Sequence, residues 1–340
     1  MSQTLAPSIP AAGPTVVASR AVQSGAVESA SIETGRVDIG TQAAWLRTWL
    51  QRFERVFVLT GAGVSTASGI PDYRDADGGW KRTPPVTWQA FTGDPATYRR
   101  YWARSFVGWP RFSRAEPGPA HRALAALAEH GPLASLITQN VDGLHQRAGS
   151  RDVIDLHGRL DGVVCLGCGL RTSREALQAR MADTNAGWSG GEAATAPDGD
   201  ADLDRAAATR FVAPHCTVCD GLVKPDVVFF GENVPGERYR RALDALHAAQ
   251  AVLVVGSSLM VYSGFRFARM AHERGQPLAI LTSGRTRADD LTELKLDAEC
   301  GATLEAALAT APTTAQATRP SGHAQDVDDQ PAPQAGAGDG

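Results

Sequence analysis

The sequence predicts an α/β protein: a doubly wound, parallel sheet of the Rossmann type that carries a smaller inserted module. Three observations support this prediction. Short apolar runs rich in β-branched residues alternate with helical patterns, a glycine-rich turn follows the first of these runs, and a stretch that holds four of the five cysteines interrupts the alternation.

Four apolar runs are the predicted strands of this sheet. They cover residues 56–60, 134–140, 251–258 and 277–283 (VFVLT, ASLITQN, AVLVVGSS and PLAILTS). Continuous apolar runs, rather than alternating ones, are typical of parallel strands whose two faces are both covered by helices. Residues 121–131 (HRALAALAEHG) predict one such helix, and Gly131 followed by a proline marks its end.

The remaining stretches define the domain organisation. Residues 1–40 and 311–340 are rich in Ala, Ser, Pro and Gly without periodicity, so we expect two disordered tails around a folded part at 41–310. Within the folded part, 41–160 and 233–310 belong to the large Rossmann-like portion. Residues 161–232 form the inserted module, which includes a Gly/Asp/Ala-rich excursion at 187–202.

Composition narrows the class of protein. With 340 residues, 43% of them hydrophobic, the chain can bury a sizeable core. Its net charge of −4 is spread along the chain, which disfavours a direct nucleic-acid ligand because that partner requires a concentrated basic face. There is no apolar run long enough for a membrane span and no secretory signal, so we expect a cytoplasmic protein. The oligomeric state is not indicated.

The four cysteines of the inserted module form two Cys-x-x-Cys pairs, Cys165 with Cys168 and Cys216 with Cys219. Each pair can place two thiolates on one ion, and two pairs complete a tetrahedral Zn²⁺ site. Because protein ligands fill all four positions, no place remains for a reactive water. The pattern therefore predicts a zinc-binding module with one structural Zn²⁺.

Polar residues with catalytic potential follow the predicted strands. Gly61 and Gly63 begin a G-x-G pattern that suits the approach of a pyrophosphate to a helix N-terminus, but Thr66 occupies the third glycine position, so a simple tight turn stays an alternative. At the end of the next strand lie amide and carboxylate side chains suited to ribose hydroxyls and a carboxamide. His157 comes shortly after them, and although a lone histidine is more often structural, this position favours chemistry.

The order and context of these motifs resemble the sirtuin family over about residues 45–305. The motifs are GAGVSTASGIPDYR at 61–74, TQNVDGLH at 138–145, His157 followed by glycine, the two cysteine pairs, KPDVVFFGE at 224–232 and GSSLMV at 256–261. Residues 100–112 and 224–234 resemble the class II branch of that family.

The resemblance implies NAD as co-substrate and assigns roles to matching residues. The implied catalytic residues are His157, Asn140 and Asp142. The implied NAD-binding residues are Gly61, Ala62, Gly63, Ser65, Asp72, Tyr73, Arg74, Gln139, Asn140, Asp142, Gly256, Ser257, Ser258, Thr282, Ser283, Gly284 and Cys300. The implied substrate-binding strand, which would pair with the substrate backbone, comprises Val228, Phe229, Phe230 and Gly231.

The resemblance also implies an activity, the NAD-dependent removal of acyl groups from the lysines of protein partners. Its products are free lysine, nicotinamide and O-acyl-ADP-ribose. His157, with an ordinary pKa near 6.5, would take a proton from a ribose hydroxyl. A mono-ADP-ribosyltransferase and a catalytically weak NAD sensor are the alternatives. The broken G-x-G-x-x-G pattern disfavours a nicotinamide oxidoreductase.

Two positions bear on specificity. Thr282 stands where the family usually has Asn against the adenosine ribose, and we expect the other contacts to keep NAD bound. Tyr101 and Arg104 lie three residues apart, hence on one helical face, and resemble the Y-x-x-R pair of sirtuins that remove succinyl and malonyl groups. The alternative, which the class II resemblance favours, is that Tyr101 packs in the helix and Arg104 forms a surface ion pair.

Overall fold

The computed structural model describes residues 37–81, 84–189, 200 and 205–309. The chain divides into two units, Met1–Val37 and Asp38–Gly340, and every described residue except Val37 belongs to the second. Residues 1–36 of the predicted N-terminal tail (1–40), the predicted C-terminal tail at 311–340 and most of the excursion at 187–202 lie outside the described residues. Helix α1 (Ile39–Leu50) starts two residues before the predicted folded part, because the Asp38 carboxylate caps it by accepting from Thr41 N at 3.0 Å.

A six-stranded parallel sheet forms the centre of the second unit. Its strands are β1 (Val56–Thr60), β2 (Leu133–Thr138), β3 (Ile154–Asp155), β7 (Ala251–Val255), β8 (Leu278–Leu281) and β9 (Leu294–Leu296). They follow the order β3-β2-β1-β7-β8-β9, and every neighbouring pair is parallel. The chain reverses its direction of travel across the sheet between β1 and β7, which is the switch point of a doubly wound fold. The predicted fold class is confirmed.

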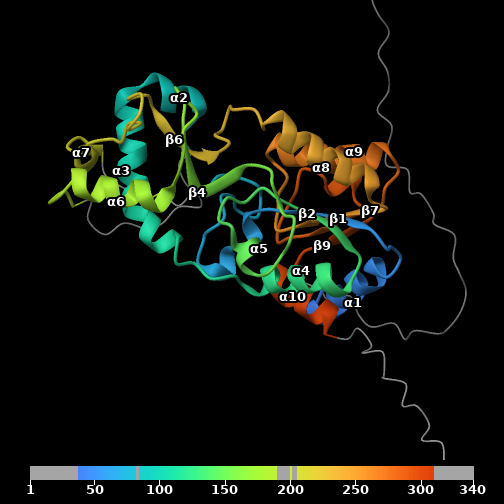
Figure 1. The fold of residues 1–340 in the computed structure, drawn as a ribbon. Helices are drawn as coiled ribbons and strands as arrows, with labels where there is room; N and C mark the ends of the chain where they lie inside the picture. The colour runs from blue at the N-terminus through green and yellow to red at the C-terminus, as the bar shows by residue number, and fades with distance from the viewer. Residues whose placement is uncertain (1–36, 82–83, 190–199, 201–204, 310–340) are drawn as a thin grey trace, which may run out of the picture. The chain divides into compact units, whose positions relative to one another are not determined.

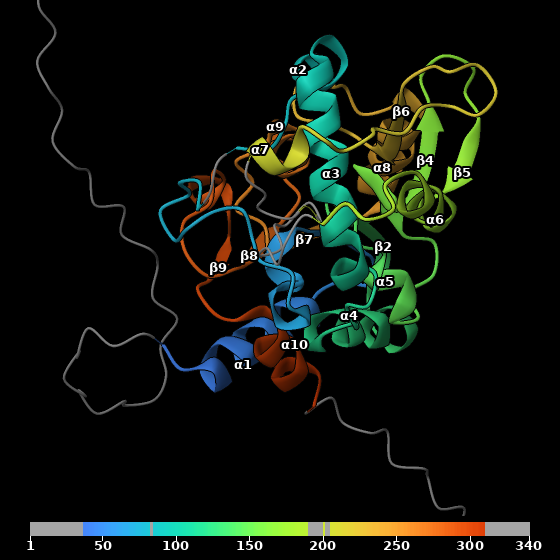
Figure 2. The same ribbon diagram turned by 90° about the vertical axis from the view of Figure 1, so that its left-hand side faces the viewer.

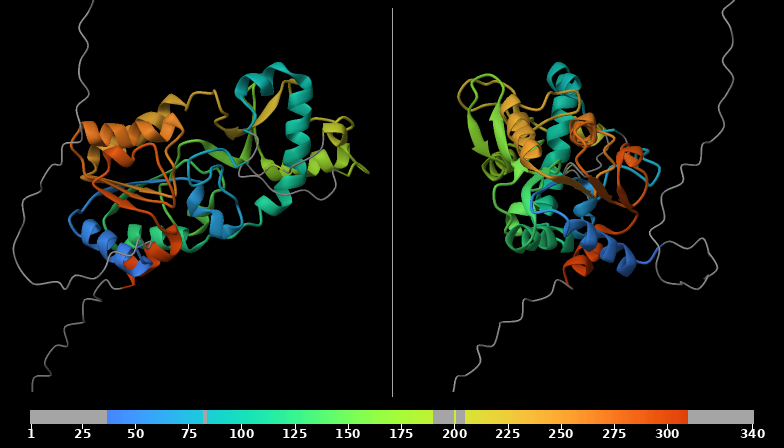
Figure 3. Two further views of the ribbon diagram at one scale, coloured as in Figure 1. Left: turned by 180° about the vertical axis from the view of Figure 1, so that it is seen from behind. Right: turned by 90° about the vertical axis from the view of Figure 1, so that its right-hand side faces the viewer.

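Helices cover both faces of this sheet (Figures 1 and 3). Helices α1, α4 (Pro119–His130) and α10 (Cys300–Leu308) lie on one face, and α8 (Gly236–Ala248) and α9 (Tyr262–Glu273) on the other. The side chains of β1 alternate accordingly: Val56 and Val58 belong to the first apolar core, Phe57 and Leu59 to the second. All five residues of β1 are buried, which explains why the sequence shows an unbroken apolar run.

A three-stranded antiparallel sheet forms the smaller part, in the order β5-β4-β6. Its strands are β4 (Gly158–Cys165), β5 (Arg171–Ser173) and β6 (Val223–Val227), and α6 (Arg174–Thr184) and α7 (Arg205–Ala208) belong to the same part. Two helices that precede β2 in the chain, α2 (Trp88–Gly93) and α3 (Pro95–Phe112), also pack here, as Figure 2 shows for α3. The smaller part is therefore built from two separate stretches, where the sequence indicated only 161–232.

Short elements complete the second unit: η1 (Ala62–Val64), η2 (Thr66–Ser68), α5 (Leu144–Arg147) and η3 (Asp289–Leu291). Among the helices that the structure describes, none has the length and apolar character needed to cross a bilayer.

Candidate functional site

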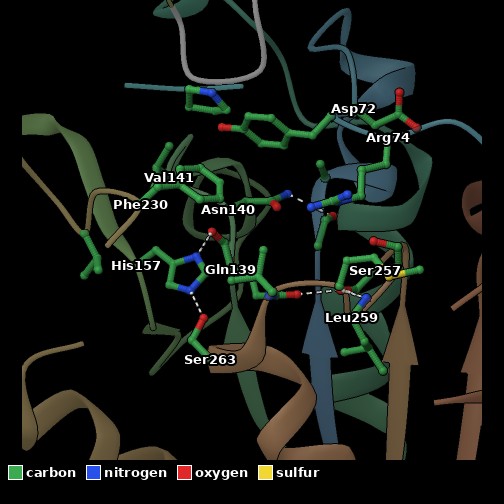
Figure 4. Close-up of a pocket in the computed structure, with 18 of the residues that line it drawn as sticks. Asp72, Arg74, Gln139, Asn140, Val141, His157, Phe230, Ser257, Leu259 and Ser263 are labelled. Carbon is green, nitrogen blue, oxygen red and sulfur yellow. Dashed lines mark hydrogen bonds between the residues drawn. The ribbon is translucent and has the colours of Figure 1, made fainter. Parts of the chain in front are cut away.

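A cavity of about 400 Å³ opens where the carboxyl ends of β1, β2, β7 and β8 meet the loop after β6. This is the switch point of the sheet, the place where open α/β folds bind their ligands. Figure 4 shows side chains from both parts of the molecule converging on it. Its size is within the range of sites for small molecules and cofactors.

The glycine-rich turn after β1 forms two 3₁₀ turns, η1 and η2, and not the α-helix N-terminus that the pattern suggested. Gly61 N donates to Val255 O at 3.0 Å, and Gly63 N donates to Gly256 O at 2.8 Å. A Cβ on Gly63 would stand 2.8 Å from the Gly256 Cα. The glycines therefore let the turns after β1 and β7 pack against each other, and their two amides are already engaged.

Ser65 is the centre of a buried hydrogen-bond network behind the cavity. Its hydroxyl donates to Asp142 Oδ2 at 2.7 Å and accepts from Asn140 Nδ2 at 2.9 Å. His121 Nε2 lies 3.4 Å from the same oxygen, and its Nδ1 accepts from Gly118 N, which places the ring proton on Nε2. The network fixes the carboxylate and the amide that the sequence proposed for catalysis. Burial lowers the pKa of His121, which keeps it neutral.

Asp142 and Asn140 are held by further contacts besides Ser65. Asp142 Oδ1 accepts from Leu144 N at 2.9 Å, and Asn140 Nδ2 also donates to Gly61 O at 3.1 Å. Both oxygens of the carboxylate accept from the protein, so the side chain of Asp142 is held in one orientation at the cavity wall. The side chain of Gln139 is fixed in the same way, since its Oε1 accepts from Ser257 Oγ at 2.6 Å.

His157 lies between the two sheets, and both of its ring nitrogens have partners (Figure 4). Nδ1 lies 2.9 Å from the backbone oxygen of Gln139, and Nε2 lies 2.7 Å from Ser263 Oγ. Burial, with a smaller contribution from Arg238 and Arg266, lowers its pKa to about 4 against the hydrogen bond to Gln139. The prediction of an ordinary pKa was wrong, because a half-buried ring near two guanidinium groups is disfavoured as a cation.

The IPDYR segment also lines the cavity, with Asp72 and Arg74 across it from His157 (Figure 4). Asp72 pairs with Lys81 at 2.5 Å, and Arg74 donates to Gly78 O at 2.7 Å while its guanidinium lies 4.0 Å from the centre of the Trp80 ring. Burial lowers the pKa of Arg74. Tyr73 contacts the edge of Trp80 and of Phe230. These residues form one aromatic and charged wall.

The residues expected at the adenosine end divide into two groups. Those that line the cavity are Gly256, Ser257, Ser258, Thr282 and Ser283. Gly284 and Cys300 are not among its lining residues. The thiol of Cys300 donates to Leu281 O at 3.6 Å inside the apolar core, and burial raises its pKa to about 12.

The four residues of the predicted substrate strand, Val228 to Gly231, all line the cavity, but they lie in the loop after β6, which ends at Val227. Several of its backbone groups already have partners: Val228 N donates to His157 O at 2.8 Å, and Phe230 O accepts from Trp88 N at 2.8 Å. Phe229 N donates to Glu232, whose carboxylate pairs with the buried Lys224 at 2.7 Å. The ion pair holds the segment in place and explains the charged ends of the KPDVVFFGE motif.

The four paired cysteines come together at the tip of the small sheet, on the turns beside β4 and β6. Their sulfur atoms lie within 4.8 Å of one another, with Cys165 and Cys219 at 3.5 Å and Cys168 and Cys216 at 3.7 Å. Tetrahedral zinc with Zn–S bonds of about 2.3 Å needs sulfurs roughly 3.8 Å apart, so the donor set fits Zn²⁺. Backbone donors of Cys168 and Gly167 lower the pKa of Cys165 to about 6.

Part of the cavity wall consists of residues that the sequence did not indicate as site residues. The missed lining residues include Ile70, Trp80, Val86, Val141, Leu160, Asn233, Val234, Leu259, Met260, Val261, Tyr262, Ser263, Arg266 and Arg285. Leu259, in the segment after β7, has a positive φ of 56°, which is a strained backbone conformation for a residue other than glycine. Of the Y-x-x-R pair, Tyr101 lines the cavity and Arg104 does not.

A family model described as the Sir2 family matches residues 61–263. The chain belongs to the Sir2 family. Among its curated relatives, an NAD-dependent protein deacetylase of Xanthomonas campestris pv. campestris is 61% identical over 76% of this chain and 88% of its own. NAD-dependent protein deacetylase 2 of Bradyrhizobium diazoefficiens is 56% identical over 76% of this chain and 95% of its own.

Solved Sir2 structures share the fold at lower identity. A Sir2 complex with a p53 peptide and NAD⁺ is 30% identical, with a TM-score of 0.59 over 77% of this chain and 94% of that one. A Sir2 variant with deacetylated p53 peptide and 3′-O-acetyl-ADP-ribose is 30% identical, with a TM-score of 0.62 over 77% and 95%. The sirtuin resemblance is confirmed, while the class II assignment stays a prediction.

Proposed function

We propose that this Sir2-family protein is an NAD-dependent protein deacetylase that transfers the acetyl group of a modified lysine to the ADP-ribose part of NAD and releases nicotinamide. The observation that carries the proposal is the placement of a neutral His157 beside the fixed pair Asn140 and Asp142, at the switch point of the sheet. The deacetylase names of the relatives support the same activity.

The residues around the cavity fit NAD. Asn140 and Asp142 present an amide and a carboxylate, which suit the ribose hydroxyls and the carboxamide of nicotinamide. The hydroxyls of Ser257, Ser258 and Thr282 line the opposite end and suit the diphosphate and the adenosine ribose. When bound, NAD supplies the electrophilic ribose carbon and the ribose hydroxyl that accepts the acyl group.

His157 would act as the general base for that hydroxyl. A base must be deprotonated before it can act, and with a pKa of about 4 the imidazole is neutral at physiological pH. Gln139 O accepts from Nδ1, so the lone pair of the ring is on Nε2. The low pKa makes His157 a weaker base than a free histidine, but its ring is deprotonated at every pH well above 4.

Asn140 and Asp142 would orient the nicotinamide end of NAD. The buried Ser65 donates its only proton to Asp142 and accepts from Asn140, so the two side chains cannot exchange roles. Preorganisation of this kind lowers the cost of holding a substrate in its reactive geometry. Tyr73 and Arg74 would cover this end of the cavity.

The acyl-lysine would enter beside Val228, Phe229 and Phe230, where the wall is apolar and Tyr101 completes it. An apolar wall suits the aliphatic lysine stem and a small uncharged acyl group. The four cysteines would hold one structural Zn²⁺ at the far tip of the small sheet, which takes no part in the reaction. Such cysteines need a reducing compartment, which supports a cytoplasmic location.

The proposal is tested by incubating the purified protein with NAD and peptides that carry acetyl-, propionyl-, butyryl- or succinyl-lysine. Mass spectrometry should detect free lysine peptide, nicotinamide and O-acyl-ADP-ribose. No freed lysine from any peptide would overturn the proposal, and ADP-ribose attached to protein side chains would support a mono-ADP-ribosyltransferase instead.

A further inference from the structure

We propose that Ser263 relays the proton from the ribose hydroxyl to His157, so that the base of this enzyme is a serine–histidine pair. The inference rests on the proposed function and adds a catalytic residue from a helix far along the chain from His157. Ser263 belongs to α9, and its Oγ lies 2.7 Å from His157 Nε2 although 106 residues separate the two.

The direction of this hydrogen bond follows from the other side of the ring. A backbone carbonyl can only accept, so the contact between His157 Nδ1 and Gln139 O at 2.9 Å requires the proton on Nδ1. A neutral ring carries one such proton, and the lowered pKa of His157 keeps it neutral. Nε2 is therefore an acceptor, and the hydroxyl of Ser263 donates to it.

The hydrogen bond from Ser263 occupies the lone pair on His157 Nε2, which the reaction needs to accept a proton. A ribose hydroxyl cannot donate to Nε2 while Ser263 does so, because an imidazole nitrogen has one lone pair. The Ser263 oxygen, however, has lone pairs of its own. Both His157 and Ser263 line the cavity, and among the described residues His157 is the one hydrogen-bond partner found for Ser263 Oγ. The serine oxygen can therefore accept from a ligand in the cavity.

The relay balances in protons and electrons. The O–H bond of the ribose breaks and an O–H bond forms on Ser263 Oγ, while the original Ser263 O–H bond breaks and an N–H bond forms on His157 Nε2. The electron pair left on the ribose oxygen attacks the acyl carbon. The net result is one proton moved to His157, which becomes an imidazolium with Arg238 and Arg266 nearby. The unfavourable charge gives this proton a strong tendency to leave again.

A purely structural serine predicts different behaviour. If Ser263 only orients the ring, a ligand hydroxyl would replace it on Nε2, and its removal would leave the proton transfer intact or make it faster. The hydrogen bond from Nδ1 to Gln139 O would still hold the tautomer. The rate of the proton-transfer step after removal of the serine hydroxyl therefore distinguishes a relay serine from one that only orients the ring.

The test uses Ser263→Ala, with Ser263→Thr as the variant that keeps a hydroxyl and Ser113→Ala as an exposed-serine control. Acetyl transfer is followed in single turnovers, and exchange of labelled nicotinamide into NAD serves as the internal control because it precedes the proton transfer. We expect Ser263→Ala to slow acetyl transfer by about 10–10²-fold, less than the 10²–10⁴-fold of general-base catalysis because water can replace the hydroxyl. Nicotinamide exchange should stay within about twofold, and Ser263→Thr should recover most of the rate.

Rates in mixtures of H₂O and D₂O give a second readout. The relay moves two protons in one step, so the rate of acetyl transfer by the parent enzyme should depend on the deuterium fraction along a curve, and a straight line would contradict the relay. Unchanged acetyl transfer in Ser263→Ala, or equal losses of transfer and exchange, would overturn the relay. A parent enzyme that frees no lysine would instead overturn the proposed function, so the two failures are distinguishable.

Discussion

The two sheets of this protein are stabilised in different ways. In the six-stranded sheet every residue of β1 and β7 is buried, and apolar cores lie on both faces. In the three-stranded sheet β5 is exposed throughout, and the turns that carry the cysteines have Cys168 and Cys219 at the surface. Apolar burial on both faces dominates in the large part, whereas the tip of the small part carries a cluster of four cysteines that fits one shared ion.

The cavity lies where these two parts meet, and each supplies one half of it. Gly61 and Asn140 come from the large part, while Tyr101 and Phe229 belong to the aromatic core of the small part. We infer that NAD binding depends mainly on the first part and acyl-lysine binding on the second. Changes to the metal site, the base, the pH and the acyl end of the cavity test this division.

Removal of the metal should reveal the difference in stability between the two parts most clearly. Chelation, or Cys165→Ser, should release about one Zn²⁺ per chain and with it the binding free energy of the ion, which is roughly 10–16 kcal/mol in zinc-finger peptides. Hydrogen exchange should report loss of protection in β4–β6 but not in β1 and β7. Cys300→Ser is the matched control, since its thiol lies in the core of the large part. Purified protein without zinc, or simultaneous loss of protection in both sheets, would contradict the comparison.

Replacement of the base should abolish the reaction but not the folded structure. His157→Ala should reduce deacetylation by about 10²–10⁴-fold, because it removes the acceptor of the ribose proton. The dissociation constant of NAD, measured by calorimetry, should change little. The exposed His130 at the end of α4 gives the control His130→Ala. Turnover near that of the parent would remove His157 from the mechanism.

Acid should lower the free energy of unfolding through three histidines. The pKa values of His121, His145 and His157 are all lowered, to about 3 for His145 and about 4 for His157. Below the unfolded value of about 6.5 the unfolded chain binds these protons and the folded chain does not. The free energy of unfolding should therefore fall as the pH drops from about 6.5 toward 4, by at most about 1.4 kcal/mol per pH unit for each histidine.

Urea denaturation at pH 7, 6 and 5 measures this dependence. His145→Asn should reduce the slope, because the ring of His145 is almost fully buried and its Nε2 contacts Thr60 at 2.9 Å. A free energy of unfolding that is constant or rises between pH 7 and pH 5 would contradict the assignment of these rings as neutral.

The smallest effect is expected at Arg104. Tyr101 packs against Phe91 and Phe229, with ring centroids at 5.0 and 5.4 Å, whereas Arg104 does not line the cavity. We therefore expect uncharged acyl groups to be preferred, and Arg104→Met to change kcat/KM on acetyl and succinyl peptides by about twofold at most. A parent enzyme that prefers succinyl-lysine and loses this preference in the variant would restore the Y-x-x-R hypothesis.

Features that depend on a few neighbouring residues could be predicted from the sequence. The run at 56–60 coincides with β1, and the end of the 251–258 run is the turn after β7. The cysteine pairs were found from their spacing. The short strands β3 and β9 were missed, because two or three residues carry no pattern of their own.

Contacts between distant segments could not be predicted. Nothing near His121 or Ser263 indicates that one contacts Ser65 and the other contacts His157. The packing of α2 and α3 against the small sheet was missed for the same reason, since the aromatic residues at 91, 98, 101 and 102 indicate burial but not the partner. The lowered pKa of His157 also depends on arginines far along the chain.

We propose that His157, Asn140 and Asp142 form the site of an NAD-dependent deacetylase. The most direct test is the stoichiometry of one reaction with NAD and an acetyl-lysine peptide, in the parent and in His157→Ala. We predict one nicotinamide and one O-acetyl-ADP-ribose for each lysine freed by the parent, and almost no freed lysine with the variant. Nicotinamide release without freed lysine in the parent, or equal yields from both proteins, would contradict the account.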